Sequence, residues 1–232
     1  FEAFDPRALS EYGYGRYPNV VTSVEFERIL SSTGPYGGVV LRPSDGDLPE
    51  KVAFIQCVGS RDERVGNPYC SSVCCMYSIK EAVIAEEHNP GLSPTIFFMD
   101  VRAFGKEFDD YYRRAEEEHG VRFVRCRVSH TDEDPETHDI FLTYEEGGEV
   151  RREQFNMAVL SVGMNPPKDA EKIAGILGVE LNRHGFCGTR TFAPLETTRP
   201  GIYVCGAFSS PKDIPDSVAQ AGAAAAEALA LV

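Results

Sequence analysis

The sequence predicts an α/β fold in which helices cover a parallel sheet. Strand-like and helix-like segments alternate from residue 51 onward, in the order KVAFIQCVG, a cysteine-bearing helix over about 70–88, PTIFFMDV, KEFDDYYRRAEEEHG and VRFVRCRV. The strand-like segments are apolar almost throughout, which is typical of parallel strands buried on both faces. Gly120 follows the charged helix directly, at the position where glycine commonly ends a helix.

The segments on either side of this alternation are less regular. Residues 1–48 are rich in turns and contain one short helix, TSVEFERILSS, where Thr22 and Glu25 predict a capping box. Further on, IFLTYEEGGEVRREQF predicts a hairpin through its two adjacent glycines, and MAVLSVG predicts a buried strand. A weaker amphipathic helix, an irregular stretch, a short strand GIYVCG and an alanine-rich terminal helix follow.

This order of elements is that of a nucleotide-binding domain inserted into the flavin domain of a two-domain flavoprotein. We therefore expect three segments. Residues 1–48 are predicted to be part of a flavin-binding domain, residues 49–164 the inserted domain with the cysteines, and residues 165–232 the rest of the flavin-binding domain.

Composition excludes several functions. The chain has 232 residues and a formal net charge of −13, so it offers no basic face for nucleic acid. No apolar run reaches the roughly 18 to 20 residues that span a bilayer. No signal peptide is visible, and seven cysteines in such a chain indicate a reducing, cytoplasmic compartment. Because the chain begins at Phe1 rather than methionine, we expect it to be a fragment.

Four cysteines gather where the first strand meets the following helix. A dinucleotide-binding turn would carry GxGxxG at this point, but the chain reads CVGSRDERVGNPYCSSVCC. The cysteines of this turn have the spacing C-x12-C-x3-C-C. A helix N-terminus there would supply unpaired N–H groups and positive potential, which stabilise thiolates and anionic clusters.

Four interpretations of these cysteines remain open from the residues. Free cysteine is among the most buried residue types, so plain packing is one of them. A redox disulfide is a weaker interpretation, because no CxxC is present. Structural zinc prefers two short-spaced pairs, whereas an iron–sulfur cluster tolerates irregular spacing. The pattern therefore favours a cluster, and Cys126, Cys187 and Cys205 are interpreted as structural.

The C-terminal string TTRPGIYVCGAFSSPKDIPDSVAQAGAAAAEA is typical of a flavin site. Its short strand ends at Gly206, where the ribityl–phosphate chain of a flavin could approach the backbone. A helix beginning between Ile214 and Ser217 would point its N–H groups at the N1/O2 edge of the flavin, stabilising negative charge on the reduced ring.

The chain resembles the heterodisulfide reductase A-type family, a group of flavoproteins that includes flavoprotein subunits of quinone-interacting membrane oxidoreductase complexes. The strings VAFIQCVGSRD, YCSSVCCMYSIKEA, PKDIPDSVAQAGAAAAEA and FDPRALSEYGYGRYPNVVTSVEFERIL carry the resemblance, which extends over essentially the whole chain. It implies a thioredoxin-reductase-like FAD fold with a [4Fe–4S] cluster. It also implies an oxidoreductase that passes electrons between FAD and the cluster, and that in some members bifurcates them between ferredoxin and a heterodisulfide.

The resemblance implies site residues and partners as well. The cluster ligands would be Cys57, Cys70, Cys74 and Cys75. The segment Pro211 to Val218 would line the isoalloxazine, with Lys212 near its reactive edge. The full set of expected FAD contacts is Gly206, Ala207, Lys212, Asp213, Ile214, Pro215, Ser217 and Val218. Expected partners are other subunits of a heterodisulfide reductase-type or quinone-interacting complex and a donor such as hydrogenase or ferredoxin; a homodimer is compatible with the resemblance.

The chain also departs from the family pattern. It carries neither the GxGxxG unit for the FAD adenosine nor the ferredoxin-like modules that flank the core, so we expect this fragment alone to be inactive. Two alternatives stay open. One is an NAD(P)H-dependent flavin or disulfide reductase of the thioredoxin-reductase type, and the other is a non-catalytic, zinc-stabilised interaction module.

Overall fold

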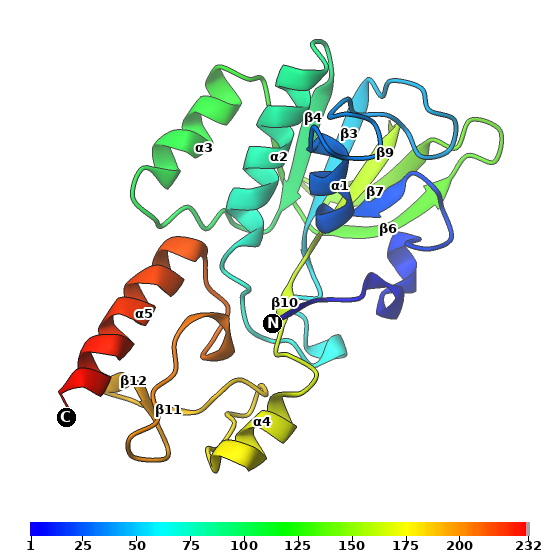
Figure 1. The fold of residues 1–232 in the computed structure, drawn as a ribbon. Helices are drawn as coiled ribbons and strands as arrows, with labels where there is room; N and C mark the ends of the chain where they lie inside the picture. Colours follow the sequence, from blue (N-terminus) through cyan, green and yellow to red (C-terminus); the bar gives the residue numbers. More distant parts are fainter. Residues whose placement is uncertain (231–232) are drawn as a thin grey trace. The chain divides into compact units, whose positions relative to one another are not determined.

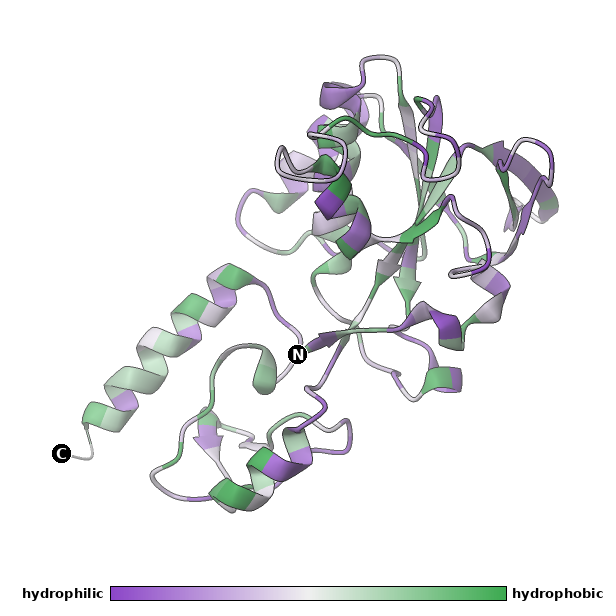
Figure 2. Ribbon diagram, turned by 45° about the vertical axis from the view of Figure 1, so that its right-hand side comes forward, coloured by the Kyte–Doolittle hydropathy of each residue, from purple (hydrophilic) through white to green (hydrophobic). Residues whose placement is uncertain are grey.

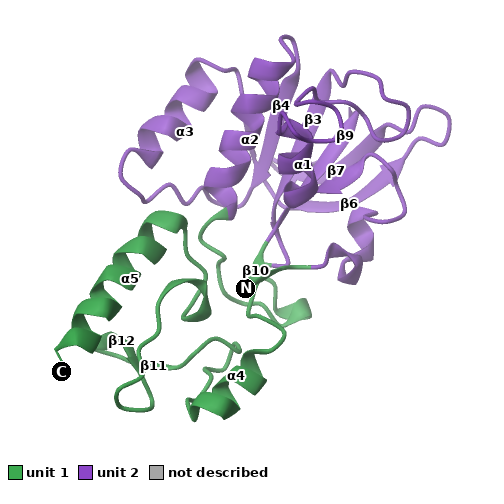
Figure 3. Cartoon of the chain, in the orientation of Figure 1, with its two compact units in different colours: residues 1–4, 60–73, 163–232 green, residues 5–59, 74–162 purple. Residues whose placement is uncertain are grey.

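The computed structural model describes residues 1–230 and divides into two compact units (Figure 3). Unit 2 comprises residues Asp5–Gly59 and Cys74–Val162. Unit 1 comprises Phe1–Phe4, Ser60–Val73 and the chain from Gly163 onward.

Unit 2 is built on a five-stranded parallel sheet with the strand order β2-β9-β3-β4-β5 (Figure 1). The strands are β2 (Val20–Thr22), β3 (Lys51–Val58), β4 (Ser93–Phe98), β5 (Arg122–Arg125) and β9 (Met157–Val162). Every residue of β9 is buried, as expected for a central strand of a parallel sheet. The predicted parallel α/β sheet is confirmed.

Three helices contribute to the main core of unit 2: α1 (Ser23–Leu30), α2 (Cys74–His88) and α3 (Phe108–Glu117). Phe26 of α1 and Ile79 of α2 pack with Phe54 of β3 in this core, where all three side chains are almost fully buried. The predicted capping box is confirmed, because Thr22 Oγ1 accepts from the Glu25 backbone N–H while Glu25 accepts from the Thr22 N–H.

A three-stranded antiparallel sheet completes unit 2. It consists of β6 (Val128–Glu133), β7 (Ile140–Glu146) and β8 (Glu149–Phe155), and the predicted glycine pair joins the last two strands. Tyr144 and Phe155 pack edge-to-face on Phe97 of β4. The segment predicted as one strand over 121–128 is divided: the chain leaves the parallel sheet after Arg125, and Val128 begins the antiparallel sheet.

Unit 1 has little regular structure and a small core. It contains the pair β1 (Glu2–Ala3) and β10 (Met164–Asn165), helix α4 (Ala170–Leu177), the pair β11 (Thr189–Arg190) and β12 (Ala193–Thr197), and helix α5 (Ile214–Leu229). The strand predicted at 201–206 forms only one isolated bridge, between Tyr203 and Glu196.

Helix α5 begins at Ile214, as predicted, but packs against little. None of its residues is buried, and Ile214, Val218 and Leu229 are between 66% and 80% exposed. Hydrophobic residues follow much of its length (Figure 2). In the described residues, no helix is long and apolar enough to cross a membrane.

The compact units do not follow the predicted boundary at 48, whereas unit 2 ends at Val162, close to the predicted boundary at 164. Residues 5–48 belong with the parallel sheet because β2 pairs with β9. Residues 60–73 belong to unit 1, where Tyr69 Oη and Ser71 Oγ bond to the backbone of Met164. The assignment of the flanking segments to a flavin-binding domain stays a prediction.

Glu81 of α2 gives unit 2 a built-in pH dependence. Its side chain is 2% exposed, and its Oε2 has no hydrogen-bond partner among the described residues. Burial, together with the nearby charge of Glu27, raises the pKa of this carboxyl well above its ordinary value. The folded protein therefore holds a proton that the unfolded chain releases above about pH 4.3, so stability falls as pH rises above that value.

We expect Glu81→Gln to raise the free energy of unfolding, and more at pH 8 than at pH 5, because the amide carries no charge to bury. Thermal unfolding at both pH values measures the effect; each 1 kcal/mol corresponds to roughly 2–4 °C for a chain of this size. Glu87→Gln, an exposed position on the same helix, is the matched control. If the difference in stability between Glu81→Gln and the unmodified protein does not increase with pH, Glu81 is not neutral in the folded protein.

Candidate cysteine and flavin sites

Cys57 occupies a strained turn at the carboxyl end of β3. Its φ of 61° lies in the left-handed region, which glycine adopts easily and a cysteine does not. The pairing of β3 with β9 shifts register between Ile55 and Val58, so the strain coincides with a bulge. A side chain retained at a position that favours glycine, at a cost of about 1–3 kcal/mol, points to function.

Cys74 and Cys75 are the first two residues of α2. Both are buried, at 1% and 5% exposure. The Cys75 thiol donates to the Asp100 carbonyl oxygen over 3.8 Å. Their position at the start of a 15-residue helix places both sulfurs in the positive field of its N-terminus, which favours a negative ligand or thiolate.

Cys70 lies in unit 1, in a loop that hydrogen bonds hold tightly. Ser60 Oγ donates to the Tyr69 carbonyl and accepts from the Ser71 N–H, and both serines are almost completely buried. Within this loop the Ser72 backbone N–H donates to Cys70 Sγ over 3.3 Å. Ser72 also has a left-handed φ, of 63°. The loop thus presents one sulfur with a backbone donor directed at it.

The structure therefore distributes the four predicted ligands over both units. Cys57, Cys74 and Cys75 belong to unit 2, and Cys70 belongs to unit 1. Among residues 1–230 no three His, Cys, Asp or Glu side chains are gathered closely enough to hold a metal ion. As a donor set, four cysteines fit a [4Fe–4S] cluster. That they act together stays a prediction from their spacing.

Gln56 is a polar residue of this region that no sequence motif marked. It directly precedes Cys57, and its side chain is 8% exposed. Neither Oε1 nor Nε2 has a hydrogen-bond partner among the described residues. A buried amide without partners costs roughly 1–3 kcal/mol. Its sequence signal is a single amide at the end of the otherwise apolar run VAFIQ, and it is the type of group that a bound cofactor would satisfy.

The remaining cysteines differ from these four. Burial raises the pKa of the Cys126 thiol to about 12. Cys187 packs in the small core of unit 1, where burial raises its pKa as well. Both environments favour the neutral thiol, in accord with the prediction that these two residues are structural.

The predicted flavin segment forms a braced loop in unit 1. Gly206 has a φ of 66°, and its N–H donates to Gln220 Oε1 over 3.0 Å. Lys212 is 8% exposed, and its ammonium donates to Ser209 Oγ and, over 2.8 Å, to Gln220 Oε1. Burial lowers the pKa of this ammonium. In this structure Lys212 therefore holds the loop together, and its expected position beside a flavin stays a prediction.

The start of α5 is capped from within the same segment. The Asp213 carboxylate accepts from the Asp216 N–H over 2.8 Å, and Ser217 Oγ donates to the Asp213 carbonyl. Ile214 and Val218 are exposed. The capping carboxylate satisfies the Asp216 N–H, the Ser217 N–H bonds to the Asp213 carbonyl, and Pro215 has no N–H. In the first turn this leaves the Ile214 N–H for an anionic or polar ligand. The remaining expected contacts, Ala207 and Pro215, lie in the same segment at a half-buried and an exposed position, respectively.

Comparison with known proteins identifies the family. Residues 94–228, more than half of the chain, match the family described as pyridine nucleotide-disulphide oxidoreductase. The chain belongs to this family. The fold agrees: a thioredoxin reductase from Lactococcus lactis aligns with a TM-score of 0.59 at 19% identity, over 98% of this chain and 62% of that one. A thioredoxin reductase from T. acidophilum aligns with a TM-score of 0.58 at 14% identity, over 93% of this chain and 58% of that one.

The curated relatives are more similar in sequence. An A-type iron-sulfur subunit of the CoB–CoM heterodisulfide reductase of Methanopyrus kandleri is 46% identical over 98% of this chain. The A-type subunit of the H(2):CoB-CoM heterodisulfide,ferredoxin reductase of Methanothermobacter marburgensis is 44% identical over 98%. The chain spans 35% of the length of either relative. The thioredoxin-reductase-like fold and the similarity to the A-type subunits of heterodisulfide reductases, both predicted, are confirmed.

The hydrogen bonds around Cys70 make a testable prediction. We expect Ser60→Ala to leave the buried Ser71 N–H without a partner and to remove one of two hydrogen bonds to the Tyr69 carbonyl, which keeps its bond from the Arg61 N–H. The loss costs about 1–3 kcal/mol locally and accelerates amide exchange roughly fivefold or more over residues 61–73. Hydrogen exchange followed by mass spectrometry measures it. Ser32→Ala, at an exposed serine, is the control. Equal exchange in both variants would show that the loop does not depend on Ser60.

Proposed function

We propose that this chain is part of an electron-transfer flavoprotein subunit of a heterodisulfide reductase-type complex, in which electrons pass between FAD and a [4Fe–4S] cluster. The observation that carries the proposal is the 44–46% identity to heterodisulfide reductase subunits over nearly the whole chain. The names of relatives include the term iron-sulfur, and this chain has a four-cysteine set at a strand–helix junction.

For the cluster, we propose Cys57, Cys70, Cys74 and Cys75 as ligands. When bound, a cluster of this kind supplies one-electron transfer. The chain's own contribution would be charge compensation: the start of α2 offers N–H groups beside Cys74 and Cys75, and the Ser72 N–H already donates to Cys70. The uncommitted amide of Gln56 adjoins the same turn in sequence.

For the flavin, we propose the segment from Gly206 to Val218. A bound flavin supplies both one- and two-electron steps, which suits an exchange with a one-electron cluster. The residues of this segment would position the ring: the left-handed Gly206 allows close approach, and the positive end of the α5 dipole, with the Ile214 N–H, lies in the same segment. Lys212 would act indirectly, by fixing the loop through Ser209 and Gln220.

The proposal extends to the setting of the whole protein. Relatives are named as subunits, and ferredoxin occurs in several of their names. We therefore propose other subunits of such a complex as partners, a donor such as hydrogenase or ferredoxin, and a cytoplasmic location. In its more specific form, the proposal is that the whole protein bifurcates electrons between ferredoxin and a heterodisulfide.

One observation favours a second function, NAD(P)H-dependent flavin or disulfide reduction. Unit 2 has a parallel sheet of the dinucleotide-binding type, and the matched family is named for pyridine nucleotides. Against it, Cys57 stands at the end of β3 where this class has glycines, and no GxGxxG is present. NADPH binding measured by calorimetry would separate the two functions.

We expect Cys→Ser changes at the four proposed ligands to lower bound iron and sulfide about tenfold or more, because the cluster loses an anchoring thiolate. Iron and sulfide analysis and electron paramagnetic resonance of anaerobically reconstituted protein measure the loss, independently of activity. Cys126→Ser and Cys187→Ser are matched controls. Protein without iron after reconstitution would overturn the cluster, and zinc alone would favour the zinc-stabilised interaction module.

A further inference from the structure

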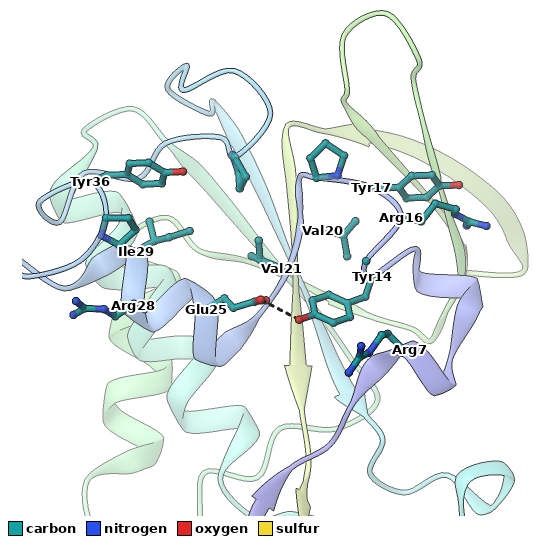
Figure 4. Close-up of a pocket in the computed structure, with 14 residues that line it drawn as sticks. Arg7, Tyr14, Arg16, Tyr17, Val20, Val21, Glu25, Arg28, Ile29 and Tyr36 are labelled. Carbon is teal, nitrogen blue, oxygen red and sulfur yellow. Dashed lines mark hydrogen bonds between the residues drawn. The ribbon is translucent and has the colours of Figure 1, made fainter.

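An open groove in unit 2 is lined by none of the proposed cluster or flavin residues. It has a volume of about 800 Å³ and runs beside β2 and α1 (Figure 4). Its floor is apolar, and its walls combine aromatic rings, prolines and arginines. The lining comprises Val20, Val21 and Ile29, then Tyr14, Tyr17 and Tyr36, then Pro18, Pro35 and Pro43, and finally Arg7, Arg16, Arg28, Glu25 and Gly15.

One wall of the groove is fixed by a hydrogen bond to the capping box. Tyr14 Oη donates to Glu25 Oε1 over 2.9 Å, as Figure 4 shows. The other oxygen of Glu25 accepts from the backbone and hydroxyl of Thr22. The carboxylate of Glu25 is therefore fully engaged within the protein, and the Tyr14 ring is held in place before any ligand arrives.

A second wall is fixed by close packing. The Arg16 guanidinium lies over the Tyr17 ring, 4.4 Å from its centroid. Gly13 approaches the same ring so closely that a Cβ on it would lie 2.1 Å from Tyr17 Cδ2. Gly13 also has a left-handed φ of 71°. Glycine at this position thus gives Tyr17 the room to face the groove, and a rigid aromatic wall binds at a lower entropic cost than a mobile one.

The lining of the groove carries three arginines and one carboxylate, that of Glu25, in a strongly acidic protein. Arg7 is neutralised by a bidentate pair with Asp5. Arg28 bonds to the Thr33 carbonyl and hydroxyl, and Arg16 stacks on Tyr17, but within the described part of the chain neither has a carboxylate partner. These two unneutralised cations contrast with a formal net charge of −13 for the chain.

We propose that this groove binds an acidic, extended, proline-containing segment of a partner polypeptide. Tyrosine and arginine are the residues that dominate binding energy at protein interfaces. Grooves walled by aromatic rings accommodate extended polyproline-type segments, whose conformation is set before binding. The arginines select acidic residues on such a segment, because complementary charge sets specificity and association rate.

The arrangement of the arginines favours a polypeptide over a compact anion such as a nucleotide. Arg7 comes from the short 3-10 helix Pro6–Ala8, Arg16 from the turn before β2 and Arg28 from α1. Figure 4 shows the three side chains spread along the groove rather than converging on one point. Phosphate sites gather several donors around one anion. An extended chain with acidic residues at intervals fits dispersed cations better.

The test uses the full 232-residue chain and fluorescein-labelled peptides with the sequences (Glu-Pro)4 and (Gln-Pro)4. Fluorescence anisotropy gives the affinities. We expect the acidic peptide to bind at least about tenfold more tightly than the neutral one, and raising the salt from about 0.05 M to about 0.3 M to weaken it several-fold. Equal binding of the two peptides, or no binding of the acidic one, would overturn the proposal.

Variants locate the binding. Arg16→Gln with Arg28→Gln should weaken the acidic peptide about tenfold, because both unneutralised cations are lost. Arg151→Gln, an exposed arginine of β8, is the matched control and should leave affinity unchanged. Tyr17→Ala should weaken binding while Tyr17→Phe retains it, and Gly13→Ala should weaken it by displacing the ring.

Two further outcomes would count against the proposal. The Arg151→Gln control could lose as much affinity as the groove variants. That result would show that the peptide responds to the overall charge of the protein and does not bind in this groove. Displacement of the peptide by ADP at a similar concentration would identify a nucleotide site instead. Neither result depends on iron or flavin content. The peptide-binding proposal can therefore be wrong while the proposed electron-transfer function is right, and the reverse. Thermal unfolding of each variant shows that its fold is retained.

Discussion

The ladder between β3 and β9 is the interaction on which unit 2 depends. It pairs Val52 with Met157 and Ile55 with Leu160, and so joins segments about a hundred residues apart against the entropy of closing that loop. Because β9 also pairs with β2, one buried strand connects the N-terminal part of the chain to the centre of the sheet. Parallel pairing then brings the carboxyl ends of β2, β3 and β9 to one edge, which is where open α/β sheets bind ligands.

That edge is unusual in its chemistry. The first turns of α2 are anchored to β9 by the contact between Ser78 and Ser161 hydroxyls, 2.7 Å apart, and by Tyr77 Oη donating to the Val162 carbonyl. The helix start is thereby held beside the turn in which Cys57 keeps a left-handed backbone. Glycine would relieve that strain and would suit a dinucleotide. A strained cysteine, preceded by a Gln56 amide with no hydrogen-bond partner among the described residues, agrees with the proposed role of Cys57 as a cluster ligand.

Unit 1 is held together differently. Its apolar core is small, and Phe192 and Ile176 are largely exposed. Buried polar groups hold its loops instead: Ser60 and Ser71 for the segment with Cys70, and Lys212 for the segment with Gly206. Losing one hydrogen bond destabilises such loops more than losing one methyl group does, because each lost partner leaves a buried polar group unsatisfied.

The sequence by itself determined the parallel sheet, the capping box of α1, the glycine hairpin and the start of α5. These features depend on local periodicity and on turn and cap chemistry, which can be recognised from residues close together in the sequence. It also singled out the cysteine and flavin segments, because unusual residues replace an expected motif there. Only the tertiary structure placed residues 5–48 with the sheet, divided the strand after Arg125 and assembled Tyr14, Tyr17 and Tyr36 into a groove. It also left atoms of Gln56 and Glu81 without a hydrogen-bond partner among the described residues. Those features arise from contacts between distant parts of the chain, and no short-range pattern encodes them.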